Sequence, residues 1–145
     1  MIKLIQRFTD KKIVDLNKVI KIDYDFYLVD DKLRNVCKKI KKKAAYIGTY
    51  LGKKDKPSLY LLDLLAKNSK KKVWVNEKGE WLFICKRDLF ANSIKDISCK
   101  LNDFVLVMNQ HDECIGYGQM IADLSSKKTV VKRVFDIGDF LRRER

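Results

Sequence analysis

The chain is poor in the residues on which most enzymatic and metal chemistry depends. Its 145 residues include one histidine and four cysteines, and no two cysteines form a Cys-x-x-Cys pair. No Gly-x-Ser-x-Gly, Walker-type or complete dinucleotide-binding glycine motif occurs. We therefore expect no catalytic set, no metal ion and no cofactor.

Long apolar runs are also absent. No stretch reaches the roughly 18 apolar residues of a membrane-spanning helix, and the first residues lack the apolar region of a signal peptide. We expect a cytoplasmic protein that does not contact a membrane. In that compartment disulfides are rare, so we expect free, mostly buried thiols at the four cysteines, which are Cys37, Cys85, Cys99 and Cys114.

Positive charge is abundant, with 32 Lys and Arg against 19 Asp and Glu and a net charge of +13. The excess lies in residues 1–72, which hold 20 cations and 8 anions, whereas residues 73–145 hold 12 and 11. Such charge favours a polyanionic partner, because Lys and Arg release counterions when they neutralise phosphates. The alternative is a compositional bias, since 25 of the 32 cations are lysine.

The first half mixes short strands and helices. Residues 19–22 and 26–29 flank a polar stretch and predict a β-hairpin. Asp30 is suited to cap a helix over residues 31–42, whose apolar stripe consists of Leu33, Val36, Cys37 and Ile40. The leucine-rich block over 59–65 predicts a strand that passes into a short helix.

The second half reads as short strands separated by turns, and the lysines at 70–72 mark the expected boundary between domains 1–70 and 71–145. This spacing is typical of a small barrel or sandwich. The expected strands are residues 73–75, 104–108, 114–120, 129–131 and 134–135, with a turn over 76–79 and a short helix over 88–93.

Several residues suggest chemistry but have a simpler interpretation. His111 and Glu113 match half of a zinc deaminase signature, although a polar hairpin tip explains them as well. Asp136 and Asp139 could form an acid pair, but the glycine between them indicates a turn or cap. Two further glycines, Gly116 and Gly118, favour a close approach of the backbone to another strand or to RNA.

The candidate binding residues are cations late in the chain. Neighbouring residues of a strand face opposite ways, so each of the pairs Lys127–Lys128 and Lys132–Arg133 should place one cation on an outer face. Arg142 and Arg143 either contact phosphate or solvate the end of the chain. Four aromatic residues could stack on bases or fill the core: Trp74, Tyr117, Phe135 and Phe140.

Residues 73–141 resemble a PUA domain, which is a small RNA-binding β pseudo-barrel. The resemblance rests on Lys72-Val-Trp-Val75, Asp103-Phe-Val-Leu-Val107, Ile115-Gly-Tyr-Gly118 and Asp136-Ile-Gly-Asp-Phe-Leu-Arg142. It implies an α+β protein, with an N-terminal α/β domain that contains a small antiparallel sheet and a C-terminal PUA pseudo-barrel.

The first half extends this resemblance to the Nip-seven family of large-subunit ribosome biogenesis factors. The matching segments are Phe26-Tyr-Leu-Val-Asp-Asp-Lys-Leu33, Ile47-Gly-Thr-Tyr-Leu-Gly-Lys53 and Leu62-Asp-Leu-Leu-Ala66. The compact, lysine-rich form looks archaeal. The resemblance implies a non-catalytic factor that binds pre-rRNA through Lys127, Lys128, Lys132 and Arg133, and secondarily through Arg142 and Arg143, while the N-terminal domain meets assembly or exosome-related proteins. Because that domain carries the charge, we expect RNA to contact it too.

Two other functions remain open at this point. An RNA-modification enzyme, or its PUA-bearing accessory subunit, would need a catalytic residue in the first half, where Asp23, Asp25, Cys37 and Asp63 are available without a partner set. A protein-interaction adaptor would need neither catalysis nor RNA, and its charge would be a matter of composition. Turnover of RNA would indicate the modification enzyme, and salt-insensitive RNA binding would indicate the adaptor.

Overall fold

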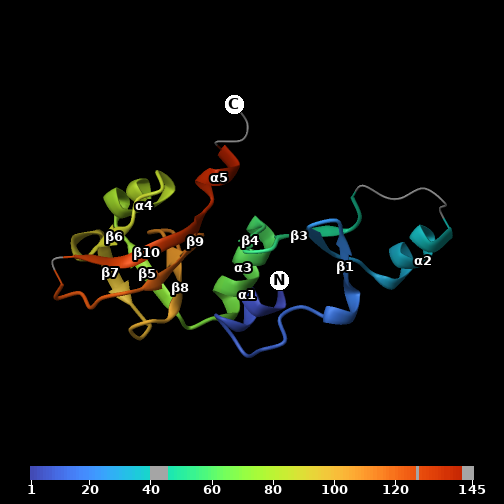
Figure 1. Cartoon of the computed structure of the whole chain (residues 1–145), viewed down its shortest axis with the longest axis horizontal. Helices are drawn as coiled ribbons and strands as arrows, with labels where there is room; N and C mark the ends of the chain where they lie inside the picture. The colour runs from blue at the N-terminus through green and yellow to red at the C-terminus, as the bar shows by residue number, and fades with distance from the viewer. Residues whose placement is uncertain (40–45, 127, 142–145) are drawn as a thin grey trace.

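The computed structural model describes residues 1–39, 46–126 and 128–141. Two sheets lie at opposite ends of an elongated molecule, with helices α1 and α3 between them (Figure 1). The first half contains α1 (Ile2–Gln6), η1 (Leu16–Lys18), β1 (Val19–Ile22), β2 (Asp25–Leu28), α2 (Asp31–Lys39), β3 (Thr49–Lys53), β4 (Lys56–Pro57) and α3 (Leu59–Asn68). The second half contains β5 (Lys72–Val75), α4 (Glu77–Ile84), β6 (Leu89–Phe90), η2 (Ala91–Ser93), β7 (Ile94–Ile97), β8 (Phe104–Met108), β9 (Cys114–Met120), β10 (Thr129–Asp136) and α5 (Gly138–Leu141).

The first sheet has four antiparallel strands in the order β1-β2-β3-β4. The predicted hairpin is confirmed, because Ile22 pairs with Asp25 and Asp23 adopts a positive φ of 52° in the turn. Asp30 caps α2 as predicted, since its Oδ1 accepts a hydrogen bond of 2.7 Å from the Leu33 amide. The described helix ends at Lys39, and Ile40 of the predicted stripe lies outside the described residues.

The second sheet has six strands in the order β6-β10-β9-β8-β5-β7. Strands β5 and β8 are parallel, and the other pairs are antiparallel. The two edge strands, β6 and β7, are joined by the three residues of η2, so the sheet nearly closes on itself. The result is a mixed pseudo-barrel, and the molecule combines helices and sheets as the α+β prediction expected.

Two apolar clusters lie on opposite faces of the six-stranded sheet, because successive strand residues point to opposite sides. Val105 and Val107 of β8 point into the pseudo-barrel, where Phe83 of α4 packs. Leu106 and Met108 of the same strand point outward, toward α1 and α3. This outward cluster joins both halves of the chain through Leu4, Ile5, Phe8, Leu61, Leu62, Leu65, Leu106, Met108, Tyr117 and Phe135.

Gly116 and Gly118 fit β9 closely against β10, which is one of the two interpretations that the sequence left open. A Cβ on Gly116 would lie 2.2 Å from the Phe135 carbonyl oxygen, and the Gly116 φ of 147° is strained for other residues. A Cβ on Gly118 would lie 2.6 Å from the Lys132 carbonyl oxygen. Both glycines therefore serve the contact between strands, which positions the cations of β10.

Two predictions about the middle of the chain differ from the structure, although the short helix expected after the leucine block is confirmed. The leucine block over 59–65 contains no strand and belongs to α3, whose first turn is capped by the Ser58 hydroxyl at 3.2 Å from the Leu61 amide. The predicted turn over 76–79 is the start of α4, because Asn76 Oδ1 accepts from the Gly79 amide at 2.8 Å. Short apolar runs do not distinguish a strand from a buried helix by periodicity alone.

Further differences concern the ends of elements and the thiols. The helix expected over residues 88–93 is absent, because residues 89–93 form β6 and η2. The two strands expected within 129–135 are a single strand with a bulge after Arg133. The stripe of α2 is not buried throughout, since Val36 is half exposed. Cys85 is exposed, so the expectation of buried thiols fails there, and the Cys37 side chain lies outside the described part of the structure. None of the described helices has the length and apolar character that crossing a bilayer requires.

Candidate nucleic-acid interface

Strand β10 and the residue before it carry the described part of the predicted cation set. Lys132 and Lys128 are exposed, and the Lys128 amide donates to the Ser126 hydroxyl at 3.1 Å. Lys127, Arg142 and Arg143 lie outside the described residues. Lys132 pairs with Gln119 of β9, which shares the outward face of Tyr117, so the Lys132 ammonium group is presented on the outside of the pseudo-barrel.

Arg133 faces the other way and is held by two acidic residues. Its amide donates to Asp88 Oδ1 at 2.8 Å, and its guanidinium Nη1 donates to Asp136 Oδ2 at 2.8 Å. The Asp136 side chain is completely buried, whereas a quarter of the Arg133 side chain is exposed. Arg133 therefore neutralises an internal carboxylate, and the adjacent cations have different surroundings.

Polar and aromatic side chains continue from Lys132 across the outer face of the sheet. Gln119 pairs with Lys132 on one side and with Phe104 of β8 on the other. The Arg7 guanidinium carbon lies 4.4 Å from the centre of the Phe104 ring, which is a cation–π contact. We name Lys132, Gln119, Phe104 and Arg7 the junction row, because they run from the pseudo-barrel to helix α1.

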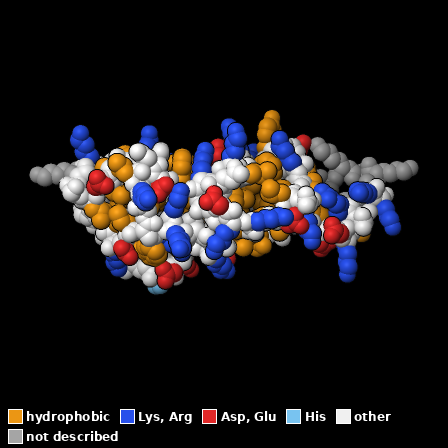
Figure 2. Space-filling view, turned by 90° about the horizontal axis from the view of Figure 1, so that it is seen from below, with side chains coloured by type: hydrophobic (Ala, Val, Ile, Leu, Met, Phe, Trp, Pro, Cys, Tyr) orange, Lys and Arg blue, Asp and Glu red, His pale blue; other side chains and the backbone are white. Residues whose placement is uncertain are grey.

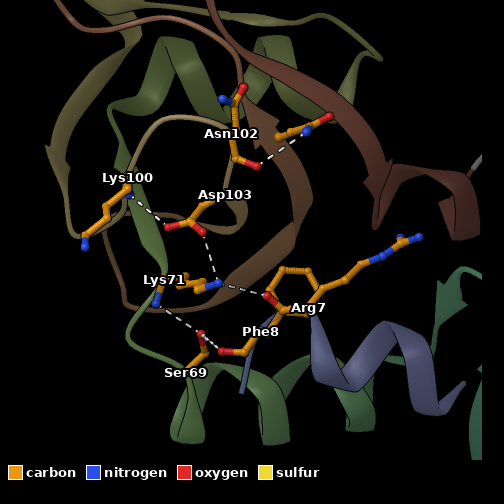
Figure 3. A network of polar contacts seen from close by, with 8 residues as sticks. Arg7, Phe8, Ser69, Lys71, Lys100, Asn102 and Asp103 are labelled. Carbon is orange, nitrogen blue, oxygen red and sulfur yellow. Dashed lines mark hydrogen bonds and ion pairs between the residues drawn. The ribbon is translucent and has the colours of Figure 1, made fainter. Parts of the chain in front are cut away.

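A network of polar contacts adjoins the junction row at Arg7 and is shown in Figure 3. Lys71 Nζ lies 3.0 Å from Asp103 Oδ1 and donates to the Arg7 carbonyl oxygen at 3.3 Å. The Ser69 hydroxyl donates to the Phe8 carbonyl oxygen at 2.9 Å and accepts from the Lys71 amide at 3.1 Å. The segment between the two halves is thus bonded to α1 on one side and to the pseudo-barrel on the other.

The electrostatics of this network keep Asp103 ionised. Burial pushes the pKa of Asp103 upward, but the hydrogen bond from the Lys100 amide and the Lys71 ammonium group outweigh it and hold the pKa below its ordinary value. Asp103 is thereby a fixed negative charge that orients Lys71. The cation of Arg7 is partly balanced too, because its Nη1 lies 3.7 Å from Asp55 Oδ1.

The aromatic residues expected to stack on bases are mainly structural. Tyr117 and Phe135 are buried in the cluster that joins the halves, and the Tyr117 hydroxyl donates to the Asp55 carbonyl oxygen at 2.7 Å. Trp74 is half-buried, with its Nε1 donating to Asp112 Oδ1 at 2.8 Å. Phe140 packs against Phe135 edge to face. The ring that the sequence missed is Phe104, under Arg7.

The residues considered for catalysis are scattered. Asp25 accepts a hydrogen bond from the Tyr50 hydroxyl, whereas Asp63 pairs with Lys67 one helical turn away. The His111 amide donates to Asn109 Oδ1 in the polar turn after β8, as a hairpin tip predicts. Within the described residues, no three His, Cys, Asp or Glu side chains gather as metal ligands. Burial raises the pKa of the Cys114 thiol to about 12, which leaves it protonated and unreactive.

The chemistry available at the surface is therefore electrostatic. Figure 2 shows basic side chains along the whole length of one face, and several project at the end where Figure 1 places the four-stranded sheet and α2. Arg7, Phe104 and Gln119 were not predicted as binding residues. The available signal was the alternation in β8 and β9, which places Phe104 and Gln119 on the outward face once the two strands are paired.

Comparison with known proteins identifies the second half. The sequence pattern of the UPF0113 PUA domain family matches residues 71–145. A UPF0113 protein from Archaeoglobus fulgidus is 33% identical over 110 residues, which cover 69% of this chain and 63% of the relative. The match thus spans less than two thirds of that relative's length.

Solved structures agree on the fold. A conserved PUA domain protein from Thermoplasma acidophilum superposes with a TM-score of 0.55 at 20% identity, over 98% of this chain and 89% of its own. A hypothetical protein from Pyrococcus horikoshii superposes with a TM-score of 0.51 at 20% identity, over 87% of this chain and 77% of its own. The six-stranded pseudo-barrel has the PUA fold, and the chain belongs to the UPF0113 PUA domain family.

Proposed function

We propose that this protein binds RNA through the junction row and acts as a non-catalytic factor in assembly of the large ribosomal subunit. The observation that carries the binding part is the row itself. Lys132 and Arg7, at the two ends of the row, supply positive charge for phosphates. Between them, Gln119 supplies an amide and Phe104 supplies an aromatic ring, which already contacts Arg7. Cations beside a ring suit a single-stranded backbone with accessible bases.

The assembly part of the proposal rests on the sequence. Segments of both halves resemble the Nip-seven family, whose members bind pre-rRNA and are not enzymes. The scattered positions of Asp25 and Asp63 support a non-catalytic role, because general acid–base chemistry needs groups within hydrogen-bond reach of one another. The partners we propose are pre-rRNA in the large-subunit precursor and other assembly or exosome-related proteins.

The binding part is tested by salt-dependent affinity. A fluorescently labelled, uridine-rich single-stranded RNA is titrated with wild type, Lys132→Ala and Arg7→Ala at several salt concentrations. Each variant should bind more weakly, and the slope of log affinity against log salt should fall by about 0.7 for each phosphate that is no longer neutralised. Lys78→Ala removes the same charge from exposed α4, outside the row, and is the matched control.

The results separate the two parts of the proposal. Equal affinities and slopes for wild type, Lys132→Ala and Arg7→Ala would remove the junction row as the binding site. The assembly role is tested by crosslinking the protein to RNA in its own cells. We expect crosslinks in large-subunit rRNA precursors, and crosslinks confined to tRNA would contradict that role. Turnover of rRNA or tRNA by the isolated protein would contradict the non-catalytic part.

A further inference from the structure

Four tyrosines lie in or beside the four-stranded sheet. Tyr27 of β2 is buried there, and three other tyrosines around it reach solvent. Tyr46 is 83% exposed, Tyr24 is 71% exposed and Tyr50 is 38% exposed. We name Tyr24, Tyr46 and Tyr50 the tyrosine strip. The strip is separate from the junction row, which lies on the pseudo-barrel and α1.

The strip is connected by direct contacts. The centre of the Tyr27 ring lies 6.4 Å from the centre of the Tyr46 ring, which it meets edge to face. It lies 5.5 Å from the centre of the Tyr50 ring, which is tilted against it. The Tyr50 hydroxyl donates to Asp25 Oδ1 at 3.2 Å, and Asp25 pairs with Lys53 across β2 and β3. Lys53 Nζ lies 5.4 Å from the centre of the Tyr24 ring. Rings and a cation therefore follow one another across the sheet.

The register of the sheet places Tyr27, Tyr50, Asp25 and Lys53 on a common face, while Tyr24 lies in the turn before β2 and Tyr46 in the segment before β3. Tyr27 pairs with Ile20 on one side and with Tyr50 on the other, and directly paired residues point the same way. Asp25 is two residues before Tyr27 on the same strand, so it shares that face, and its partner Lys53 does too. Strand pairing therefore places Tyr50 and Lys53 beside Tyr27, whereas side-chain contacts with Tyr27 and Lys53 place Tyr46 and Tyr24.

Packing against Tyr27 uses only part of the surrounding rings. The core on this face is formed by Tyr27, Val29 and Ile47, with support from Ile20, Ile22 and Leu33. Tyr46 and Tyr24 leave most of their surface in water, although aromatic rings gain free energy mainly by burial. Exposed rings on a sheet that also presents lysine provide faces for nucleobases to stack on and a charge for the backbone.

The charge of this half selects the partner. Residues 1–72 carry most of the net positive charge of the chain, so an acidic partner is attracted and a basic one is repelled. A duplex encloses its base faces, whereas a single strand offers them. We propose that the tyrosine strip is a second contact for single-stranded RNA, with Tyr24, Tyr46 and Tyr50 stacking on bases and Lys53 binding phosphate. This inference rests on the proposed function, because it assumes that the protein binds RNA.

The test uses the full chain and two labelled RNAs, a uridine-rich single strand and a duplex of equal length. Tyr24→Ala and Tyr46→Ala should each weaken binding of the single strand by about tenfold, which is typical when one aromatic ring no longer stacks on a base. The salt slope should not change, because a phenol ring releases no counterions, whereas Lys53→Ala should lower it. Duplex binding should be unaffected by either tyrosine substitution.

Two controls isolate stacking. Tyr46→Phe keeps the ring and should bind as wild type does. Tyr60→Ala removes a tyrosine that is 44% exposed on α3, outside the strip, and should also bind as wild type does. The substituted rings are largely exposed, so we expect unchanged thermal unfolding midpoints, and ultraviolet crosslinking of wild type to the single strand should map to Tyr24 or Tyr46 in the folded protein.

The outcomes distinguish this inference from the proposed function. Loss of binding in Lys132→Ala with wild-type affinity in Tyr24→Ala and Tyr46→Ala would overturn the tyrosine strip alone. Unchanged affinity in all three, with crosslinks elsewhere, would overturn both contacts. If the strip binds a protein instead, the tyrosine variants will keep full RNA affinity, and that result also contradicts the inference.

Discussion

At the scale of single residues, Arg133 differs most from its neighbours on β10. Its guanidinium group neutralises the buried carboxylate of Asp136, whereas the adjacent Lys132 is exposed. Removing one partner of a buried ion pair takes a charge-assisted hydrogen bond from the other. The same type of substitution should therefore affect stability at one position and binding at the other.

Arg133→Ala should destabilise the protein by about 2 kcal/mol, because the buried Asp136 carboxylate would lose the charge-assisted hydrogen bond that Arg133 donates. Lys132→Ala should change the free energy of unfolding by less than about 0.5 kcal/mol, as exposed substitutions usually do. Urea denaturation of the two variants measures this difference. Similar midpoints would show that Asp136 does not depend on Arg133.

Tyr117→Phe should destabilise the protein by about 1 kcal/mol, because the Asp55 carbonyl oxygen would lose its buried donor. The substitution should also alter alkaline unfolding. Burial raises the pKa of Tyr117 to about 12, above its ordinary value of about 10, so stability from the neutral phenol is present below pH 10 and is lost as pH rises toward 12. The stability of wild type should therefore fall more steeply over this range than that of Tyr117→Phe, and parallel curves would contradict the assignment.

The sequence predicted residue roles where the backbone alone decides them. Gly116 and Gly118 were expected where the backbone closely approaches another strand or RNA, and a Cβ atom added to either one would collide with β10. The partner of Arg133 was not predictable from spacing, because the bulge after Arg133 changes which residues of β10 share a face with Asp136. Whether Lys128 and Lys132 bind RNA stays a prediction.

At the scale of elements, α4 shows how a local signal misleads. Asn76 and Gly79 form a typical turn pattern in sequence, yet Asn76 caps a helix whose third residue is Gly79. The reason for the glycine is tertiary, because a Cβ there would lie 2.6 Å from the Ser93 carbonyl oxygen. The close contact with η2 therefore requires glycine at this position, and local helix propensity does not predict that requirement.

Gly79→Ala should lower stability, although alanine is favoured over glycine in helices by about 1 kcal/mol. The added methyl group would push α4 away from η2, and overpacking of this kind typically costs about 1–3 kcal/mol. Thermal unfolding measures the sign. Lys78→Ala, one residue earlier and exposed, should leave stability unchanged or raise it. A stabilised Gly79→Ala would show that the contact yields easily.

Element prediction succeeded where one side of a segment is fixed by turns. The strands at 104–108 and 114–120 are bounded by a polar turn, in which Asn109 Oδ1 accepts hydrogen bonds from the His111 and Glu113 amides. Residues 59–65 have no comparable turn signal to define their conformation. Leucines at adjacent positions are compatible with a strand as well as a helix. Packing of α3 against the outward face of the sheet resolves that ambiguity.

At the scale of the whole molecule, the two halves share one apolar cluster. Leu4 and Leu61 from the first half pack in the same cluster as Leu106 and Tyr117 from the second. The division into domains 1–70 and 71–145 stays a prediction about the sequence. The shared cluster indicates that the halves are not independent in stability.

We expect the chain to unfold in one cooperative transition. The outward face of the six-stranded sheet would expose Leu106 and Met108 to water if the first half unfolded alone. Calorimetry should give equal calorimetric and van't Hoff enthalpies. Two resolved transitions would show that each half is stable by itself.

The bonds that Ser69 and Lys71 make to both halves have a consequence for how a long ligand is held. A flexible linker would let the junction row and the tyrosine strip adopt many separations. The segment that contains Ser69 and Lys71 instead fixes the distance and orientation between the two surfaces. Once one part of a strand has bound, the other contact meets it at a high effective concentration, provided that the strand spans the gap. The protein would then prefer RNA strands that are long enough to contact both surfaces, a selectivity that neither surface has alone.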